Sequence, residues 1–176
     1  ADDGGARDAT QLYNGTPPSA HRARGVVGAA CDSDHVRVEL ICDGVHLHPA
    51  TVRTTFKMFG DDRICLISDS MMATGLSDGD YSLGGQPVKV VGNLATLADG
   101  TIAGSATNLM DCMRTAVKKM GIPLGSAVKC AAVNTAKAIG IYDTYGSITP
   151  GKKANIVLLD QDLNMKHLIF KGELQK

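Results

Sequence analysis

Two apolar stretches of the sequence end at ionisable side chains. Residues 63–75 read RICLISDSMMATG, in which a continuous apolar run ends at Asp69. A second run, Val36 to Cys42, is followed by Asp43 and then by His46. Short continuous apolar runs are typical of buried parallel strands, and the catalytic groups of parallel α/β folds lie where such strands end. The two stretches therefore predict part of an active-site rim.

Both side chains also have simpler interpretations. Asp is frequent in turns, so Asp69 could merely cap the turn that follows it. An isolated His at the end of a strand is more often structural than functional. His46 and His48 could instead form a metal-binding pair, because alternate residues of a strand share a face. Pro49 argues against that pair, since it begins a helix and places the two histidines across a turn.

The first part of the chain predicts alternating strands and helices. Strands are expected at Ala9–Tyr13, Val36–Cys42 and Ile64–Ser68. A helix is expected from Pro49, because the missing N–H of a proline costs little in a first helical turn. Its residues Val52, Phe56 and Phe59 share one face. This order of strand, helix and strand requires a parallel sheet, so the fold class is α/β.

The chain changes character after Gly75. Short strands are expected on either side of Gly84-Gly85, and Asp99-Gly100 is a hairpin signal. Two helices and two strands complete the expected elements: Asn108–Met120, Ser126–Ile139, Ala154–Leu159 and His167–Lys171. The methionines on one face of the first helix are expected to fill a core rather than to bind a cofactor.

Composition excludes several functional classes. The 176 residues include 18 basic and 18 acidic side chains, so no net field favours nucleic acid or a membrane surface. No apolar run is long enough to span a bilayer, and the start of the chain lacks the features of a signal peptide. The five cysteines form no CxxC pair, which predicts a cytoplasmic protein. Cys42 and Cys65 lie in predicted strands and are expected to behave as small hydrophobes.

Five sequence blocks carry a resemblance to a known family. They are ATQLYNG at 9–15, DGVH at 43–46, LISD at 66–69, DGTIAGS at 99–105 and GSITPGK at 146–152. In this order they resemble the C-terminal half of the N-acetylglucosamine-6-phosphate deacetylases, a family of the amidohydrolase superfamily. The last block is shared by many amidohydrolases, whereas DGVH, DGTIAGS and the MMATG turn after Asp69 are more specific. The resemblance covers nearly all of this chain and about half of such an enzyme.

The resemblance implies a partial (β/α)8 TIM barrel, in which the three predicted parallel strands are the last three of the barrel. It divides the chain into last barrel strands and active-site rim (1–80), an excursion of short strands with a pocket loop (81–106), closing helices (107–145) and strands of a small β-sandwich domain (146–176). Three strands cannot close a barrel, and an open sheet edge invites association. We therefore expect a homo-oligomer, a dimer or higher, or a missing N-terminal half.

The implied activity is hydrolysis of N-acetylglucosamine 6-phosphate to glucosamine 6-phosphate and acetate. A divalent metal, zinc or a similar ion, would activate the attacking water. Asp69 matches the family carboxylate that takes a proton from this water and returns it to the departing amine. His46 matches the histidine that contacts the substrate. N-acetylgalactosamine 6-phosphate is the alternative substrate, because the residues alone do not decide between the two epimers.

Further positions match the family's substrate contacts. Arg22 matches an arginine that binds the substrate phosphate and can reach a neighbouring subunit's site, a task suited to the forked guanidinium. Asn14 and Gly15 match the pair that contacts the sugar phosphate. A loop that lines the sugar pocket is matched by Ile102, Ala103 and Gly104, the last of which permits close backbone approach.

One departure bears on the metal. Gln11 stands where the family has a histidine ligand, and an amide oxygen is a weaker ligand for zinc than an imidazole. The family's other ligands, a Glu and a His, would lie before residue 1. Two hypotheses follow. The chain is either part of a deacetylase whose other half is supplied separately, or a non-catalytic truncated relative that keeps only sugar-phosphate binding or an assembly role.

Overall fold

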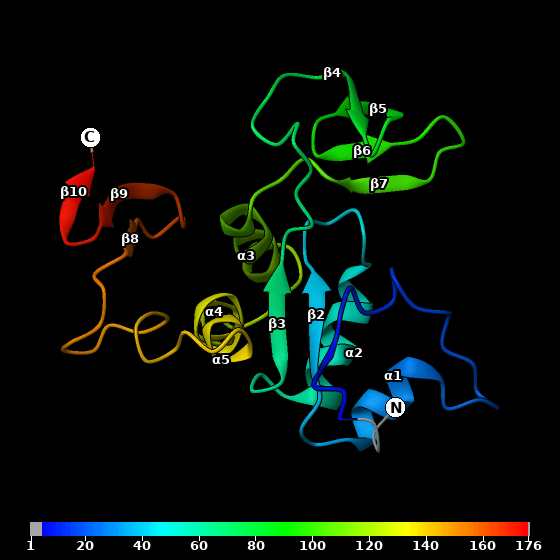
Figure 1. The fold of residues 1–176 in the computed structure, drawn as a ribbon, viewed down its shortest axis with the longest axis horizontal. Coiled ribbons are helices and arrows are strands. Elements are labelled where there is room, and N and C mark those ends of the chain that lie inside the picture. Colours follow the sequence, from blue (N-terminus) through cyan, green and yellow to red (C-terminus); the bar gives the residue numbers. More distant parts are fainter. Residues whose placement is uncertain (1–4, 176) are drawn as a thin grey trace.

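A three-stranded parallel sheet forms the centre of the computed structural model, which describes residues 5–175 (Figure 1). The sheet order is β1 (Asp8–Ala9), β2 (Arg37–Ile41) and β3 (Ile64–Ile67). Strands β2 and β3 pair in register from Val38 opposite Ile64 to Ile41 opposite Ile67. Helix α2 (Pro49–Phe59) connects these two strands, so the predicted strand–helix–strand unit is confirmed.

The predicted strand Ala9–Tyr13 is wrong beyond Ala9. Gln11 and Tyr13 have positive φ angles of 45° and 75°, which no β-strand accommodates. The segment forms a turn closed by the N–H groups of Asn14 and Gly15, both of which donate to the carbonyl oxygen of Gln11 at 2.9 Å. Leu12 is fully buried, and its N–H donates to the carbonyl of Glu39 at 2.9 Å. Tertiary packing therefore keeps this turn beside β2.

Helices cover the parallel sheet and share one apolar core with it. Helix α1 (Gly25–Asp32) precedes β2, and α3 (Leu109–Lys118) lies beside β3 in Figure 1. The core joins residues from the strands with residues from α2, α3 and the turn after α3: Leu40, Leu66, Val52, Phe59, Met113, Ala116 and Met120. Met113 and Met120 are buried, which confirms that the methionine face fills a core.

The second predicted helix is a continuous run of three helical segments. These are α4 (Leu124–Val128), the π-helical segment η2 (Lys129–Val133) and α5 (Asn134–Ala138). Asn134 is buried and anchors the run to the sheet, because its Nδ2 donates to the carbonyl oxygens of Asp61 and Ile64 at 2.7 Å each. Loss of the Asn134 amide would leave these carbonyl oxygens without this donor, which is unfavourable. The two bonds therefore fix the helix against β3.

A four-stranded antiparallel sheet is inserted between β3 and α3. Its strands, in spatial order, are β4 (Gly79–Leu83), β5 (Gln86–Val91), β6 (Leu94–Thr96) and β7 (Ile102–Ser105). The sheet has a separate small core that includes Val88, Val90, Ala95 and Ala103. In Figure 1 the arrowheads of β2 and β3 point toward this sheet, which places it at the C-terminal edge of the parallel strands.

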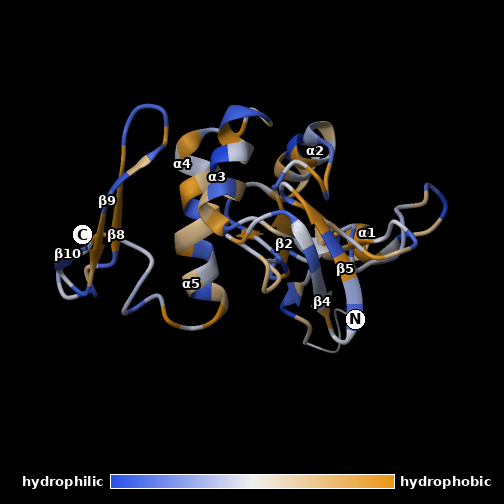
Figure 2. Cartoon of the chain, turned by 90° about the horizontal axis from the view of Figure 1, so that it is seen from above, coloured by the Kyte–Doolittle hydropathy of each residue, from blue (hydrophilic) through white to orange (hydrophobic). Residues whose placement is uncertain are grey.

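The last elements form a third sheet, of order β10-β9-β8. Its antiparallel strands are β8 (Ile156–Leu159), β9 (Met165–Phe170) and β10 (Glu173–Gln175). Exposed apolar side chains lie on neighbouring positions of β8 and β9, and so on both faces of the sheet: Val157, Leu158, Leu168 and Phe170. Figure 2 shows these two strands coloured mainly as hydrophobic. None of the helices among residues 5–175 has the length and apolar character of a membrane span.

The cysteines provide a test of this core. Cys31 is partly exposed, whereas the other four cysteines are buried and none forms a disulfide. Burial raises the pKa of Cys65 to about 11 and the pKa of Cys112 to about 12. Thiol reagents attack the thiolate, so these groups are unreactive in the folded chain.

We expect a disulfide exchange reagent at pH 8 to modify one thiol quickly in the native protein and all five after unfolding. The variant Cys31→Ser should show no fast thiol. Rapid reaction of two or more thiols in the native protein, measured by absorbance of the released leaving group, would contradict this packing.

Candidate active site

The register of the parallel sheet brings two carboxyl groups to the same edge. Asp43 and Asp69 each lie two residues beyond the last paired positions, Ile41 and Ile67. Gln11 lies two residues after Ala9, the last residue of β1. Because the C-terminal ends of parallel strands meet at one edge, three consecutive strands each contribute a polar side chain to one place.

The side chain of Asp69 is partly exposed to solvent and is hydrogen-bonded to Gln11. Its side chain is 29% exposed, and Oδ1 accepts a hydrogen bond from Nε2 of Gln11 at 2.9 Å. Its backbone has a φ of 51°, an uncommon angle for a residue with a side chain. Among residues 5–175, no backbone N–H of the turn that follows donates to this carboxylate. The turn-capping interpretation of Asp69 is therefore not what the structure shows.

His46 faces Asp69 and is held from behind by Asp43. Nδ1 of His46 lies 2.8 Å from Oδ2 of Asp43, and Nε2 of His46 lies 3.9 Å from Oδ2 of Asp69. The side chains of Asp43 and His46 are 0% and 5% exposed. The imidazole therefore has one nitrogen in a buried hydrogen bond and the other directed toward the carboxylate at the strand edge.

Asp43 accepts three hydrogen bonds. Besides the bond from His46, its Oδ1 accepts the backbone N–H groups of Val45 and His46 at 2.9 Å each. Burial by itself would raise the pKa of Asp43, but the hydrogen bonds from His46 and from the two backbone N–H groups outweigh it and lower the pKa below its usual value. Asp43 is therefore ionised at neutral pH.

His46 and His48 do not form the metal-binding pair that was the alternative interpretation. Nδ1 of His48 accepts the N–H of Ala50 at 3.2 Å and so caps the start of α2. The two imidazoles thus serve different local structures, one bonded to Asp43 and one to a helix end.

Strand β7 is bonded directly to the Asp69 segment. The N–H of Ser105 donates to the carbonyl of Asp69 at 2.8 Å, and its Oγ donates to the carbonyl of Ser68 at 2.5 Å. The N–H of Met71 returns a bond of 2.8 Å to the carbonyl of Ser105. These bonds fix the backbone on both sides of Asp69 and place the second sheet against the site.

Gly104 lies against Asp69 because it lacks a side chain. Its φ is +106°, and a Cβ added there would lie 3.2 Å from the carbonyl oxygen of Asp69 and 3.7 Å from Oδ2 of the same residue. Its neighbours differ in exposure, Ala103 being buried and Ile102 being 38% exposed. Gly104 thus lies within contact range of Asp69.

The remaining predicted contacts lie at and beyond the Gln11 turn. Asn14 and Gly15 are exposed, and an added Cβ at Gly15 would lie 3.5 Å from Oε1 of Gln11. Arg22 is exposed in the loop before α1. Among residues 5–175, no hydrogen bond or ion pair joins Arg22 to the other predicted site residues. The structure thus brings Gln11, His46, Asp69 and Gly104 together, whereas Arg22 lies in the exposed loop before α1.

The residues present do not fit a zinc site. Within residues 5–175, no three His, Cys, Asp or Glu side chains are placed to hold a metal ion. The amide of Gln11 presents its N–H, a donor, to Asp69 rather than an oxygen to a shared ligand position. The described part of the chain therefore supplies a carboxylate and an imidazole, but not a set of metal ligands.

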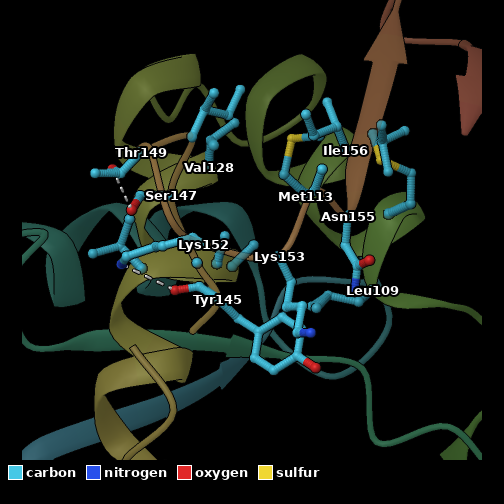
Figure 3. Close-up of a pocket in the computed structure, with 18 of the residues that line it drawn as sticks. Leu109, Met113, Val128, Tyr145, Ser147, Thr149, Lys152, Lys153, Asn155 and Ile156 are labelled. Carbon is cyan, nitrogen blue, oxygen red and sulfur yellow. Dashed lines mark hydrogen bonds between the residues drawn. The ribbon is translucent and has the colours of Figure 1, made fainter. Parts of the chain in front are cut away.

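One cavity lies away from the predicted site residues. It has a volume of about 880 Å³ and lies between α3, the helix formed by α4, η2 and α5, and the segment 145–159 (Figure 3). Its lining is mainly apolar. Of its two lysines, Lys152 and Lys153, the amine of Lys152 donates to the carbonyl oxygens of Tyr142 and Tyr145. None of the predicted site residues lines it. The cavity is an uncovered apolar groove rather than a place for proton transfer.

Asp43 belongs to the DGVH block, but the sequence alone predicts no role for it. The available signal was an Asp-Gly pair after a strand with a His three residues after the Asp, a spacing that suits an Asp-centred turn. The role of Ser105 is likewise not predicted by the sequence, because no local pattern marks its bonds to the segment around Asp69. That contact joins residues far apart in the sequence.

Comparisons with known proteins agree with this architecture. The sequence model of the Amidohydrolase family matches residues 21–174. The N-acetylglucosamine-6-phosphate deacetylase of Bacillus subtilis is 39% identical over 170 residues, which are 97% of this chain and 43% of that protein. The chain thus spans less than half the length of this curated relative.

A second curated protein and a solved structure are also similar to this chain. An Escherichia coli K12 protein, named "Putative N-acetylgalactosamine-6-phosphate deacetylase", is 35% identical over 162 residues, covering 92% of this chain and 96% of that protein. The crystal structure of a mutant N-acetyl-D-glucosamine-6-phosphate deacetylase from Mycobacterium smegmatis, in complex with N-acetyl-D-glucosamine-6-phosphate, superposes with a TM-score of 0.92. It is 38% identical and covers 98% of this chain and 46% of that structure.

The contact between Gly104 and Asp69 yields a prediction. The variant Gly104→Ala should unfold at lower urea concentration, because alanine must adopt a positive φ and push against the Asp69 carbonyl. Gly100→Ala is the matched control, since Gly100 has a φ of +85° but open space around its Cβ position. The control should lose about 1–2 kcal/mol from the backbone alone, and Gly104→Ala about 1 kcal/mol more. Equal losses would show that the close approach is unimportant.

Proposed function

The chain belongs to the amidohydrolase family, and from this premise we propose that it forms the C-terminal half of a deacetylase acting on N-acetylglucosamine 6-phosphate. One observation carries the proposal. Asp69 and His46, on the ends of neighbouring parallel strands, face each other with 3.9 Å between Oδ2 and Nε2. The names of the relatives, at 38–39% identity, support this substrate class.

Asp69 suits the proton transfers of amide hydrolysis. In the proposed reaction its carboxylate takes a proton from water as the water oxygen bonds to the acetamide carbon. The same proton then passes to the amine nitrogen as the carbon–nitrogen bond breaks, releasing acetate and the amino sugar. The side chain is 29% exposed and so can reach a substrate, and its contact with Gln11 fixes the position of Oδ1.

The substrate would lie over the strand edge between Asp69 and the Gln11 turn. His46 would bind it through Nε2, and Asn14 and Gly15 would contact the sugar phosphate. We assign the phosphate itself to Arg22, whose exposed loop could serve the site of a neighbouring subunit. Ile102, Ala103 and Gly104 would border the sugar, because β7 is bonded beside Asp69.

We further infer that the parallel sheet is the last part of a (β/α)8 barrel that other elements complete. Three parallel strands leave open edges, and the groove of about 880 Å³ leaves apolar side chains uncovered. Covering these surfaces requires a further part of the fold or a partner chain. The five free cysteines, four of them buried, support a reducing, cytoplasmic location.

A second function, sugar-phosphate binding without catalysis, is favoured by a specific observation. Gln11 donates to Asp69, and residues 5–175 hold no group of three possible metal ligands. Asp69 accepts the amide N–H of Gln11 where the family has a histidine ligand, so Gln11 offers the carboxylate a hydrogen-bond donor. A polypeptide of this kind could bind the phosphorylated sugar without cleaving it.

Acetate release tests the first function. The purified protein, with and without added zinc, should release acetate from N-acetylglucosamine 6-phosphate. Asp69→Asn should lower kcat by about 10²–10⁴-fold, the usual contribution of a general acid–base group. Asp162→Asn, which removes a carboxylate that is 82% exposed, is the control and should keep full activity.

Other outcomes separate the hypotheses. Equal activity of wild type and Asp69→Asn would remove Asp69 from the mechanism. Saturable binding of either epimer by calorimetry, without acetate release under any condition, would favour the binding function. Neither binding nor release would contradict both.

A further inference from the structure

Asp43 is a buried carboxylate without a role in the proposed chemistry. Its side chain is 0% exposed, so it cannot touch a substrate directly. It lies next to Cys42 and within the same apolar surroundings as Cys112, whose thiol stays protonated because burial raises its pKa to about 12. A charge in such surroundings loses its hydration, so its retention needs an explanation beyond packing.

We propose that Asp43 is a positioning residue that fixes the tautomer of His46, with the proton on Nδ1 and Nε2 presented toward Asp69. The significance of this arrangement for catalysis rests on the proposed deacetylase function. The arrangement itself involves four atoms: the two carboxylate oxygens of Asp43 and the two ring nitrogens of His46.

The two oxygens of Asp43 have separate tasks. Oδ1 accepts the backbone N–H groups of Val45 and His46, which closes the turn after β2. Oδ2 is left for Nδ1 of His46, at 2.8 Å. An ionised carboxylate only accepts hydrogen bonds, so Nδ1 must carry the proton. In a neutral imidazole, Nε2 then has a free lone pair, and it is this atom that lies 3.9 Å from Asp69.

The turn that carries these groups is also held by contacts that do not involve the carboxylate. Nδ2 of Asn93, in the second sheet, donates to the backbone carbonyl of Asp43 at 3.1 Å. Gly44 adopts a φ of +85°, and a Cβ there would lie 3.5 Å from the methyl group of Thr115. The turn is therefore fixed in space by backbone contacts, while Oδ2 determines the ring orientation and tautomer.

Asparagine separates the two tasks. In Asp43→Asn, the amide oxygen can still accept the two backbone N–H groups and preserve the turn. The amide nitrogen then faces Nδ1 of His46 and can only donate to it. The ring must respond by moving its proton to Nε2, which turns a hydrogen-bond acceptor beside Asp69 into a donor.

Long-range proton–nitrogen NMR correlation at pH 8 reports the tautomer of each histidine in the full chain. The His46 signals are identified by their loss in His46→Gln. We expect an Nδ1–H tautomer in the wild type, an Nε2–H tautomer in Asp43→Asn, and no change in the control Asp160→Asn. Asp160 also accepts turn N–H groups, from Asp162 and Asn164, but its side-chain partners among residues 5–175 are Asn164 and Lys166 rather than a histidine.

Two results would overturn the proposal. One is an Nε2–H tautomer in the wild type, which decides the question even when Asp43→Asn fails to fold. The other is an unchanged Nδ1–H tautomer in folded Asp43→Asn. The variant Asn93→Ala, which loosens the turn but keeps the carboxylate, should retain the wild-type tautomer. A switch in that variant would assign the effect to the turn rather than to Asp43.

Activity separates this inference from the proposed function. Replacing the buried Asp of a serine protease triad by Asn leaves the geometry intact and lowers kcat about 10⁴-fold, because the tautomer is wrong. In a preparation that releases acetate, Asp43→Asn should lower kcat at least about tenfold. A tautomer switch in a protein without acetate release would leave the positioning role standing while the deacetylase proposal fails.

Discussion

The register between β2 and β3 is the constraint on which the rest of the site depends. It pairs Ile41 with Ile67. Asp43 and Asp69 are each the second residue after these positions, so they lie at the same edge of the sheet. A shift of one residue would turn every side chain of one strand to the opposite face. In β2, Val38 and Leu40 are buried whereas Arg37 and Glu39 are partly exposed, so such a shift would turn charged side chains into the core. Burial of the strands therefore sets the geometry of the polar groups at their ends.

Much of this framework was predictable from local patterns. The apolar runs 36–42 and 64–68 and the proline at position 49 gave correct positions for β2, β3 and α2, since each signal is contained in a few residues. The turn at 10–15 was not predictable in the same way, because the positive φ angles of Gln11 and Tyr13 follow from the burial of Leu12 against β2. The bonds between Ser105 and the Asp69 segment join distant parts of the chain and have no local signal.

The C-terminal edge of the parallel sheet holds groups suited to proton transfer, but among residues 5–175 it holds no set of metal ligands. It holds an accessible carboxylate with an amide donor on one side and an imidazole on the other. It offers, within residues 5–175, no cluster of metal ligands. This division agrees with a chain that spans 43% of its Bacillus subtilis relative and superposes on 46% of the Mycobacterium smegmatis structure. The groups present are those to which we assign proton transfer and substrate binding.

The second sheet touches both strand ends at once. The N–H of Ser105 donates to the carbonyl of Asp69, and the side chain of Asn93 donates to the carbonyl of Asp43. Both donors belong to the second sheet and lie close together in the sequence. The amide proton of Ser105 is fully shielded inside this junction. Its exchange with solvent deuterium requires the sheet to separate from the strand ends. The exchange rate of this single backbone amide thus reports how often the second sheet separates from the strand ends.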